Sequence, residues 1–299
     1  MLLIGGITAG VFGLGNLAAH YLRDDDLGHG KWAKYFFSGA LAGFAVGATA
    51  YAGWSGIIAL SHMGGLWGSV GGIAKWVTLG IEGVHVASTI AGATGGAINN
   101  GWRGLGNAGE ILLGNFYLDE NKSFFGQVWE GILRHTWESL QTGLGYDYSQ
   151  IRNGCKGSLD RVDFLGGVTF LTDELSGKQN GVSLGNYVNI NNFGSIGNTN
   201  FDAYVISNPL YMHEYGHTID SKRYGLSYLF AIGVPSLFSA KFSPKVTWTS
   251  AITGNTIYTS KHKIRVYERR ANRNSAKYFG VHYGVNWFNY EDYYPTEIL

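Results

Sequence analysis

One long stretch of the chain is almost free of charge, and this feature restricts the possible folds most. Between Tyr35 and Trp102 the charged residues are Lys75 and Glu82 alone. Over the whole chain 14% of residues are charged and 45% are apolar, whereas an ordinary soluble domain has about 25% charged residues. A chain this apolar is not a disordered polyelectrolyte. The net charge of +1 provides no basic footprint, so we expect no nucleic-acid partner.

Glycine is concentrated in the same part of the chain. Three sets of glycines recur at four-residue spacing: Gly6 and Gly10; Gly39, Gly43 and Gly47; Gly92 and Gly96. Such spacing lets two helix backbones approach closely, in membranes especially. Residues 37–60 carry no charge and are long enough to cross a bilayer, although glycine, serine and threonine dilute their hydrophobicity. We therefore expect a glycine- and alanine-rich apolar helical region, either as a buried hairpin or in contact with a membrane.

The flanks of this region suggest the domain organisation. The first residues lack the basic start of a secretory signal peptide, and a start inside an apolar run is typical of a piece of a longer protein. The polar stretch from Leu118 to Lys122 precedes a part with ordinary charge content. We therefore predict a boundary between residues 1–118 and residues 119–299. The single cysteine, Cys155, excludes an internal disulfide framework.

The second region is expected to be α+β. A helix is predicted at residues 124–140, followed by β-rich segments at 162–165, 168–171, 187–191 and 203–206. Later helices are predicted from residue 208, at 226–238 and at 264–279. Strands before helices favour α+β over alternating α/β. The alternation of apolar and polar residues in 187–191 predicts a half-exposed strand, which we expect to be the edge that holds a substrate.

The strongest chemical signal is His213-Glu214-Tyr215-Gly216-His217, an H-E-x-x-H pattern. On a helix, positions i and i+4 share a face, so both imidazoles can bind one Zn²⁺ ion. Glu214 lies beside the first ligand and can take a proton from the metal-bound water and pass it to the leaving amine. Asn208 and Pro209 suit the start of this helix, and Gly225 is a plausible end.

A catalytic zinc site needs a third protein ligand and an open position. The longer metzincin pattern fails, because Asp220 and Arg223 occupy its glycine and ligand positions. Glu268, on the helix predicted at 264–279, fits best as the third ligand. Its competitors are His262, His282, Asp202 and Asp220.

Other side chains are candidates to support the site. Asn272 lies one turn after Glu268 on the same face, where it can orient a histidine ligand, and the small Ala271 permits close helix packing. Asp220 follows His217 by about one turn and suits a carboxylate behind the ligand. His262 is the candidate catalytic residue for stabilising the oxyanion. The alternatives for that role are His282 and Tyr283.

Two weaker motifs are discounted. The G-x-S-x-G match at residues 181–185 lacks the strand before it and the helix after it that a serine-hydrolase elbow requires, so we expect a hairpin turn. The glycine-rich match at residues 104–109 follows no strand, which argues against dinucleotide binding.

The residues around the histidine motif resemble a known family, the zincin-like metallopeptidase toxin domains. These domains stand at the C-termini of bacterial polymorphic toxins, including Rhs-type and type VI secretion effectors. The resemblance covers about residues 125–299, and the residues that carry it are Tyr211-Met212-His213-Glu214-Tyr215-Gly216-His217-Thr218, Tyr224-Gly225, Gly233-Val234-Pro235-Ser236-Leu237, Tyr267-Glu268, Ala271-Asn272 and the run from Gly181 to Ile190.

This resemblance implies a zincin-like fold, with a small sheet and active-site helices. It implies His213, His217 and Glu268 as Zn²⁺ ligands and Glu214 as general base, acting on a peptide or protein substrate. It also implies a secreted antibacterial effector, delivered into a target cell by a bacterial secretion system and neutralised in the producer by an immunity protein. Residues 1–118 would then be covered by a secretion chaperone or adaptor, packed in a delivery structure, or inserted in a membrane.

Three hypotheses follow from the sequence. The first is a zinc-dependent endopeptidase toxin. The second is a membrane-perturbing effector whose toxicity comes from the glycine-zipper helices of the first region. The third is a binding or structural protein whose metal site does not catalyse.

Overall fold

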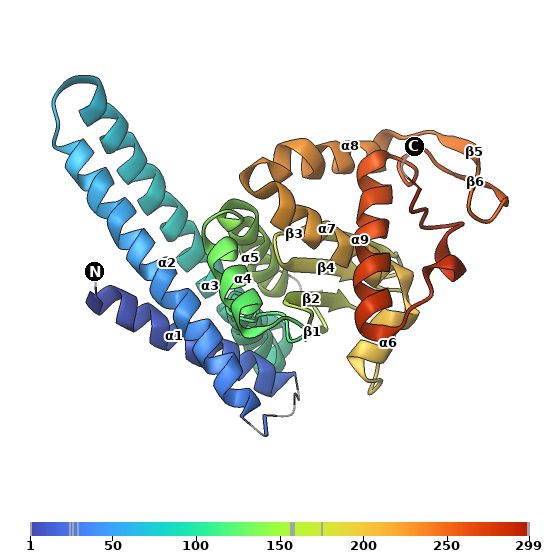
Figure 1. Ribbon diagram of the computed structural model, residues 1–299, viewed down its shortest axis with the longest axis horizontal. Helices are drawn as coiled ribbons and strands as arrows, with labels where there is room; N and C mark the ends of the chain where they lie inside the picture. The colour runs from blue at the N-terminus through green and yellow to red at the C-terminus, as the bar shows by residue number, and fades with distance from the viewer. Residues whose placement is uncertain are drawn as a thin grey trace. The chain divides into compact units, whose positions relative to one another are not determined.

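A computed structural model describes residues 2–23, 25, 27, 28, 30–155, 159–174 and 176–297. The fold is α+β and mostly helical (Figure 1). The chain forms two compact units: unit 1 comprises Met1–Thr136 and Tyr146–Thr169, and unit 2 comprises Trp137–Gly145 and Phe170–Leu299.

The elements follow in chain order. Unit 1 contains α1 (Leu2–Leu22), α2 (Lys31–Ser61), α3 (Gly65–Gly114), α4 (Phe124–His135) and β1 (Arg161–Leu165), while α5 (Ser139–Gly154) and β2 (Val168–Asp173) contribute residues to both units. Unit 2 contains β3 (Asn180–Leu184), β4 (Tyr187–Asn191), α6 (Phe201–Ser207), α7 (Pro209–Tyr224), η1 (Gly225–Ser227), η2 (Leu229–Gly233), α8 (Val234–Phe242), β5 (Lys245–Thr249), β6 (Thr256–Ser260), α9 (Val266–Tyr283) and η3 (Trp287–Tyr290).

Glycines of α2 let α1 pack against it at very short range. A Cβ atom at Gly39 would collide with the carbonyl oxygen of Phe12, and one at Gly43 with that of Thr8. The close approach predicted from this glycine spacing is therefore confirmed.

The other two glycine pairs differ from each other. Gly92 and Gly96 lie against polar side chains of α5 within unit 1, whereas a Cβ atom at Gly6 or Gly10 would meet no neighbouring atom. The spacing of Gly6 and Gly10 thus marks no helix contact among the described residues.

The long helices of unit 1 expose much apolar surface. α2 and α3 run side by side as a hairpin (Figure 1), and exposed residues of α3 include Trp67, Ile73 and Trp76. Non-helical backbone at Gly101 kinks α3. By length and composition, α1 and α2 could each cross a membrane, as could the bent pair of helices Pro209–Ser227 and Leu229–Phe242 if it is one span.

The division between the units lies further along the chain than the boundary predicted at 118/119. α4 packs against α2 in unit 1. Ser38 donates a hydrogen bond to Gln127 at 2.7 Å, and Gly131 faces Ala42 so closely that a Cβ atom at Gly131 would collide with it. These contacts place α4 with the helices before it.

The four-stranded sheet has the order β1-β2-β4-β3, so β3 is an edge strand and β4 is interior. β3 and β4 pair antiparallel, with Leu184 opposite Tyr187, and Gly185 makes the turn at φ +60°. The prediction that residues 187–191 form the edge is therefore wrong. Their apolar–polar alternation does not mark a solvent face, because Asn189 is also buried. Residues 181–184, expected in a hairpin turn, belong to the edge strand that precedes it.

Local hydrogen bonding explains another difference from the sequence. Residues 203–206 were predicted as a strand but lie in α6, because the Asn200 side chain caps this helix by accepting from the Ala203 N–H.

The helix predicted at 124–140 is interrupted at Thr136, whose φ of −125° ends α4. The hairpin of β5 and β6 was not predicted.

Helix α7 packs against both β3 and α9 in unit 2. As predicted, Asn208 caps its start, accepting from the Leu210 N–H, and Gly225 ends it with a φ of +52°. A Cβ atom at Gly216 would collide with the carbonyl oxygen of Ala271. The two small residues thus bring α7 and α9 close enough for side chains of both helices to meet.

Candidate metal centre

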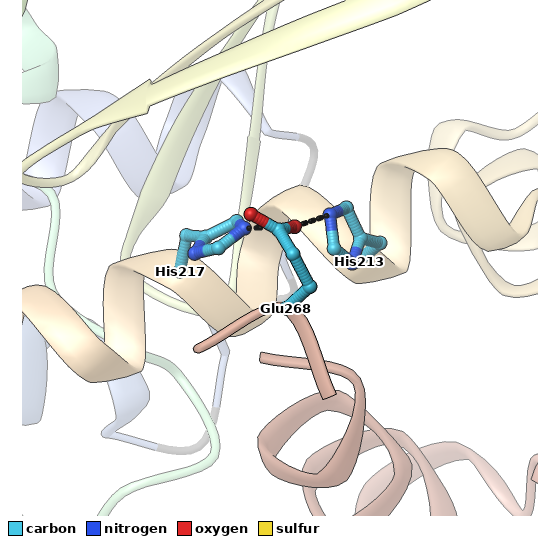
Figure 2. A group of neighbouring side chains, drawn as sticks. All are labelled: His213, His217 and Glu268. Atoms are coloured by element: carbon cyan, nitrogen blue, oxygen red, sulfur yellow. Dashed lines mark hydrogen bonds and ion pairs between the residues drawn. The ribbon is translucent and has the colours of Figure 1, made fainter. Parts of the chain in front are cut away.

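The two motif histidines meet Glu268 where α7 and α9 pack together. The Glu268 Oε2 atom lies 3.1 Å from Nε2 of His213 and 3.2 Å from Nε2 of His217. Figure 2 shows the carboxylate between the two imidazoles. The three potential ligand atoms lie within 4.8 Å of one another, so Glu268 is the third member of the cluster. Two imidazole nitrogens and one carboxylate oxygen form a donor set that zinc accepts.

A chain of hydrogen bonds determines which nitrogen of His213 is available. The Asn272 Nδ2 group donates to the Pro295 carbonyl at 2.8 Å, which leaves Asn272 Oδ1 as an acceptor for His213 Nδ1 at 2.6 Å. His213 Nδ1 therefore carries a proton, and in the neutral ring Nε2 presents a lone pair. Opposite the Glu268 carboxylate, Nε2 needs either its own proton or a metal ion between the two atoms, so the arrangement fits a metal site. The role predicted for Asn272 agrees with this geometry.

The charges of the cluster stabilise one another. Burial alone would raise the pKa of Glu268, but the charge of His217 and hydrogen bonds from both histidines hold this pKa well below its usual value. Burial alone would lower the pKa of His217, but Glu268 raises it to about 9. The buried carboxylate therefore depends on positive charge at the imidazoles or between them.

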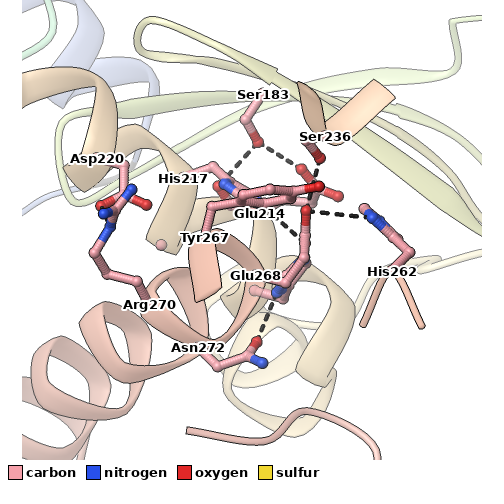
Figure 3. Close-up of polar contacts among 12 residues, drawn as sticks. Ser183, Glu214, His217, Asp220, Ser236, His262, Tyr267, Glu268, Arg270 and Asn272 are labelled. Atoms are coloured by element: carbon pink, nitrogen blue, oxygen red, sulfur yellow. Dashed lines mark hydrogen bonds and ion pairs between the residues drawn. The ribbon is translucent and has the colours of Figure 1, made fainter. Parts of the chain in front are cut away.

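The second oxygen of Glu268 is held by α8. The Ser236 hydroxyl donates to Glu268 Oε1 at 2.6 Å, as Figure 3 shows. This bond leaves Oε2 directed at the two histidines. Because Ser236 orients a buried carboxylate, it contributes to the geometry of the cluster without belonging to it.

Glu214 lies against the edge strand β3. The Ser183 hydroxyl donates to Glu214 Oε2 at 2.6 Å (Figure 3), and a Cβ atom at Gly181 would lie 2.5 Å from Glu214 Oε1. Residue 181 must therefore be glycine for the carboxylate to occupy this position. Gly181 and Ser183 project on the same side of β3, as alternate residues of a strand do.

His262 lies beside Glu268, next to the cluster. Its Nδ1 atom lies 2.6 Å from the Ser239 hydroxyl and 3.6 Å from Glu268 Oε1. Tyr267 donates to the Ser239 oxygen at 2.6 Å, and the serine proton has two acceptors, His262 Nδ1 at 2.6 Å and the Ser236 carbonyl oxygen at 3.1 Å. When the serine donates to Nδ1, His262 Nε2 carries the ring proton. Burial lowers the pKa of His262, and Glu268 partly offsets this effect.

Asp220 is a buried residue of α7 whose side chain forms hydrogen bonds with side chains of α9. Its Oδ1 atom accepts from Arg270 Nε and Asn274 Nδ2, both at 2.9 Å. Its Oδ2 atom and His217 Nδ1 are buried and have no hydrogen-bond partner among the described residues. The support of His217 by Asp220 thus stays a prediction, whereas the contact with Arg270 was not predicted.

The remaining candidates for the third ligand or the oxyanion lie away from the cluster. Asp202 is in the first turn of α6. His282 and Tyr283 are at the end of α9, roughly 20 Å along the helix axis from Glu268.

The cluster borders a cleft of about 140 Å³. β3, α7, the η2–α8 segment and His262 line it. Tyr294 packs from the C-terminal segment, with its ring centre 5.5 Å from that of His213. Burial raises the pKa of Tyr294 to about 12, and the charge of Glu214 adds to this effect.

Several functional residues were missed by reasoning from the sequence. Gly181 and Ser183 stand in the G-x-S-x-G match that was interpreted as a turn, and the alternation of the two residues was the available signal. Ser236 is in the part that carries the family resemblance, but no local pattern assigns it to Glu268. Tyr294 reaches the site only through tertiary structure.

Comparisons with known proteins add no family to this description: no family model, curated protein or solved structure matches the chain.

Proposed function

We propose that unit 2 is a zinc-dependent endopeptidase. The observation that carries the proposal is the convergence of His213 Nε2, His217 Nε2 and Glu268 Oε2, together with a second carboxylate, Glu214, at the same cleft. His213, His217 and Glu268 would hold the ion. A bound zinc ion would supply a Lewis acid that makes water more acidic and polarises a carbonyl group.

Glu214 supplies the base. Ser183 occupies its Oε2 atom, which leaves Oε1 to accept a proton from the attacking water. The water oxygen bonds to the peptide carbonyl carbon, the C–N bond breaks, and Glu214 returns the proton to the leaving amine. His262, with Nε2 protonated, would donate a hydrogen bond to the carbonyl oxygen as negative charge develops there.

The edge strand β3 supports an extended peptide as substrate. β3 pairs with β4 on one side and stands at the end of the sheet, and its residues 181–184 line the cleft. A peptide in extended conformation can add to such an edge through main-chain hydrogen bonds. This arrangement would place a backbone amide beside Glu214.

The direct test compares the purified parent with Glu214→Gln. The parent is expected to retain zinc in native mass spectrometry and to cleave a peptide library, whereas the variant retains zinc and loses cleavage. A His217→Ala variant is expected to lose both. Zinc binding without cleavage by the parent across the library would contradict the peptidase proposal and favour a non-catalytic metal site.

The biological role in the proposal is that of an antibacterial effector delivered into a target cell and neutralised by an immunity protein. Its support is the family resemblance of residues 125–299. Target-cell proteomics after expression of the parent or of Glu214→Gln tests it. New protein termini should appear with the parent alone, and equal toxicity of the two chains would contradict it.

The apolar helices of unit 1 favour a second candidate function, membrane perturbation. The supporting observation is the length and hydropathy of Leu3–Leu22 and Lys31–Ser61. The full chain should then release dye from lipid vesicles, and Thr49→Lys, which charges an exposed position of α2, should abolish the release. In the same dye-release assay, Thr78→Lys tests whether α3 takes part in membrane insertion. Equal release by the parent and Thr49→Lys would contradict insertion of α2.

A further inference from the structure

A second cavity lies next to the metal cleft and takes no part in the chemistry described above. It measures about 450 Å³. Its lining includes Gln179, Pro209, Lys263 and the three tyrosines Tyr290, Tyr293 and Tyr294. All of these residues belong to unit 2.

The edge strand leads from the metal cleft to this cavity. Gln179 directly precedes β3, and residues 179, 181 and 183 alternate along the chain. Gly181 and Ser183 face Glu214. Two residues of a strand span about 7 Å, so a peptide extended along β3 past Glu214 would reach the cavity within about two residues. Tyr294, beside His213, forms the border between the two spaces.

The cavity has a positive charge with no negative partner. The Lys263 ammonium lies 5.1 Å from the centre of the Tyr294 ring, and no ion pair of Lys263 occurs among the described residues. Partial desolvation lowers the pKa of Lys263, and no carboxylate of the described residues offsets the shift. The start of α7, which borders the cavity at Pro209, adds the partial positive charge of a helix N-terminus.

The two carboxylates that stand between Tyr290 and Tyr293 in the sequence are engaged elsewhere. Glu291 accepts hydrogen bonds from the backbone N–H and the hydroxyl of Thr296 at 2.7 and 2.9 Å. Asp292 accepts from the side chains of Thr253 and Asn255 at 2.5 and 2.8 Å. Neither carboxylate is therefore placed to neutralise Lys263.

Two further basic residues stand on the same segment of the chain as Lys263. Lys261 and Arg265 line a separate cavity of about 420 Å³, and no ion pair of either occurs among the described residues. Alternate residues of the segment 261–265 are thus basic. An anionic group approaching this segment meets positive charge.

We propose that the cavity lined by Lys263 and the three tyrosines is a subsite for an acidic side chain of a peptide substrate. A glutamate or aspartate there would pair with the Lys263 ammonium and accept hydrogen bonds from tyrosine hydroxyls. A glutamine of the same size lacks the charge. This inference rests on the proposed peptidase function, since it names the substrate class of that site.

Binding and cleavage together test the inference. Binding uses the zinc-loaded Glu214→Gln chain and pairs of fluorescent peptides that differ by Glu or Gln at one position, measured by fluorescence anisotropy. The glutamate peptide should bind about tenfold more tightly than its glutamine partner at one position, with a ratio that falls as salt rises. Adding Lys263→Gln should reduce the ratio to near one, and Lys263→Glu should invert it. Lys277→Gln, an exposed lysine of α9 outside the cavity, is the matched control and should leave the ratio unchanged.

The outcomes separate the subsite from the peptidase function. Equal binding of the two peptides, no binding of either, or a ratio that survives Lys263→Gln would each overturn the subsite. Cleavage by the parent without acidic preference would also overturn it while leaving the peptidase function intact. Charge-selective binding that depends on Lys263, with no cleavage by the parent, would support the subsite and contradict the peptidase function.

Discussion

His213 Nδ1 lies 2.6 Å from Asn272 Oδ1, and this contact connects the first motif histidine to the C-terminal segment. Because Asn272 Nδ2 donates to the Pro295 carbonyl, the amide cannot turn over without losing that bond. The Pro295 carbonyl therefore determines indirectly which nitrogen of His213 faces Glu268.

Replacing Asn272 by leucine should weaken zinc binding. The variant removes the acceptor for His213 Nδ1, and loss of such an orienting partner typically reduces metal affinity by about 10- to 100-fold. Competition with a chromophoric zinc chelator measures the change. Asn289→Leu, at an exposed position, is the control. An unchanged affinity in Asn272→Leu would show that the tautomer of His213 is fixed by other means.

Replacing Gly181 by alanine should impair turnover without affecting the metal. The added Cβ atom would meet the Glu214 carboxylate, and a displaced base is expected to reduce kcat by about tenfold or more. Zinc content by mass spectrometry should stay the same. Gly280→Ala, where the nearest non-local atom to an added Cβ is the Val285 carbonyl oxygen at 3.6 Å, is the matched control. Full activity of Gly181→Ala would mean that Glu214 does not act from this position.

Replacing Ser236 by alanine should affect the third ligand. The buried Glu268 Oε1 atom would lose its 2.6 Å hydrogen bond. Leaving a buried, charged acceptor without this partner costs about 1–3 kcal/mol of free energy. We expect zinc to dissociate several-fold faster from Ser236→Ala, as measured by stopped-flow transfer to a chelator. Ser227→Ala, at an exposed position of η1, should release zinc at the parental rate. Equal rates for Ser236→Ala and the parent would contradict a role of Ser236 in holding Glu268.

Acid should destabilise unit 1 through His135. Its ring centre lies 4.5 Å from that of Phe12 and 6.5 Å from that of Phe116, and burial lowers its pKa from 6.5 to about 4. Because the unfolded chain takes up this proton at a higher pH than the folded chain does, the free energy of unfolding is highest above pH 6.5. It falls by up to about 3 kcal/mol as the pH falls towards 4.

Urea unfolding between pH 7 and 4 measures that loss. His135→Leu should flatten the pH dependence, because the group that takes up a proton on unfolding is gone, whereas the exposed His282→Leu should not. A pH dependence that is identical in the parent and in His135→Leu would exclude His135 as its source.

The sequence predicts the cluster of His213, His217 and Glu268 well because its rules are local. His213 and His217 share a helix face by spacing alone, and Asn272 follows Glu268 by one turn, so both pairs were predicted from helix geometry. The choice of Glu268 needed one further inference, that α9 packs on α7, and Gly216 and Ala271 make this packing close.

The features that were missed depend on contacts distant in the chain. The G-x-S-x-G match at residues 181–185 was assigned to a hairpin turn because it lacked the strand before it and the helix after it that an elbow requires, although pairing with β4 and contact with Glu214 hold residues 181–184 extended. The same limitation made residues 187–191 the predicted edge, since alternation cannot distinguish a solvent-facing asparagine from a buried one such as Asn189. Residues 203–206 have β-rich composition, but one capping bond from Asn200 favours a helix.

The contact between Asn272 and Pro295 also bears on the order of events during synthesis. The ribosome completes the H-E-x-x-H motif and Glu268 before Pro295 emerges. Until then Asn272 lacks the carbonyl that orients its amide, and His213 can present either nitrogen. A nascent chain would thus contain all three residues of the cluster before its first histidine is oriented, so the final geometry of the cluster depends on the folding of the C-terminal segment.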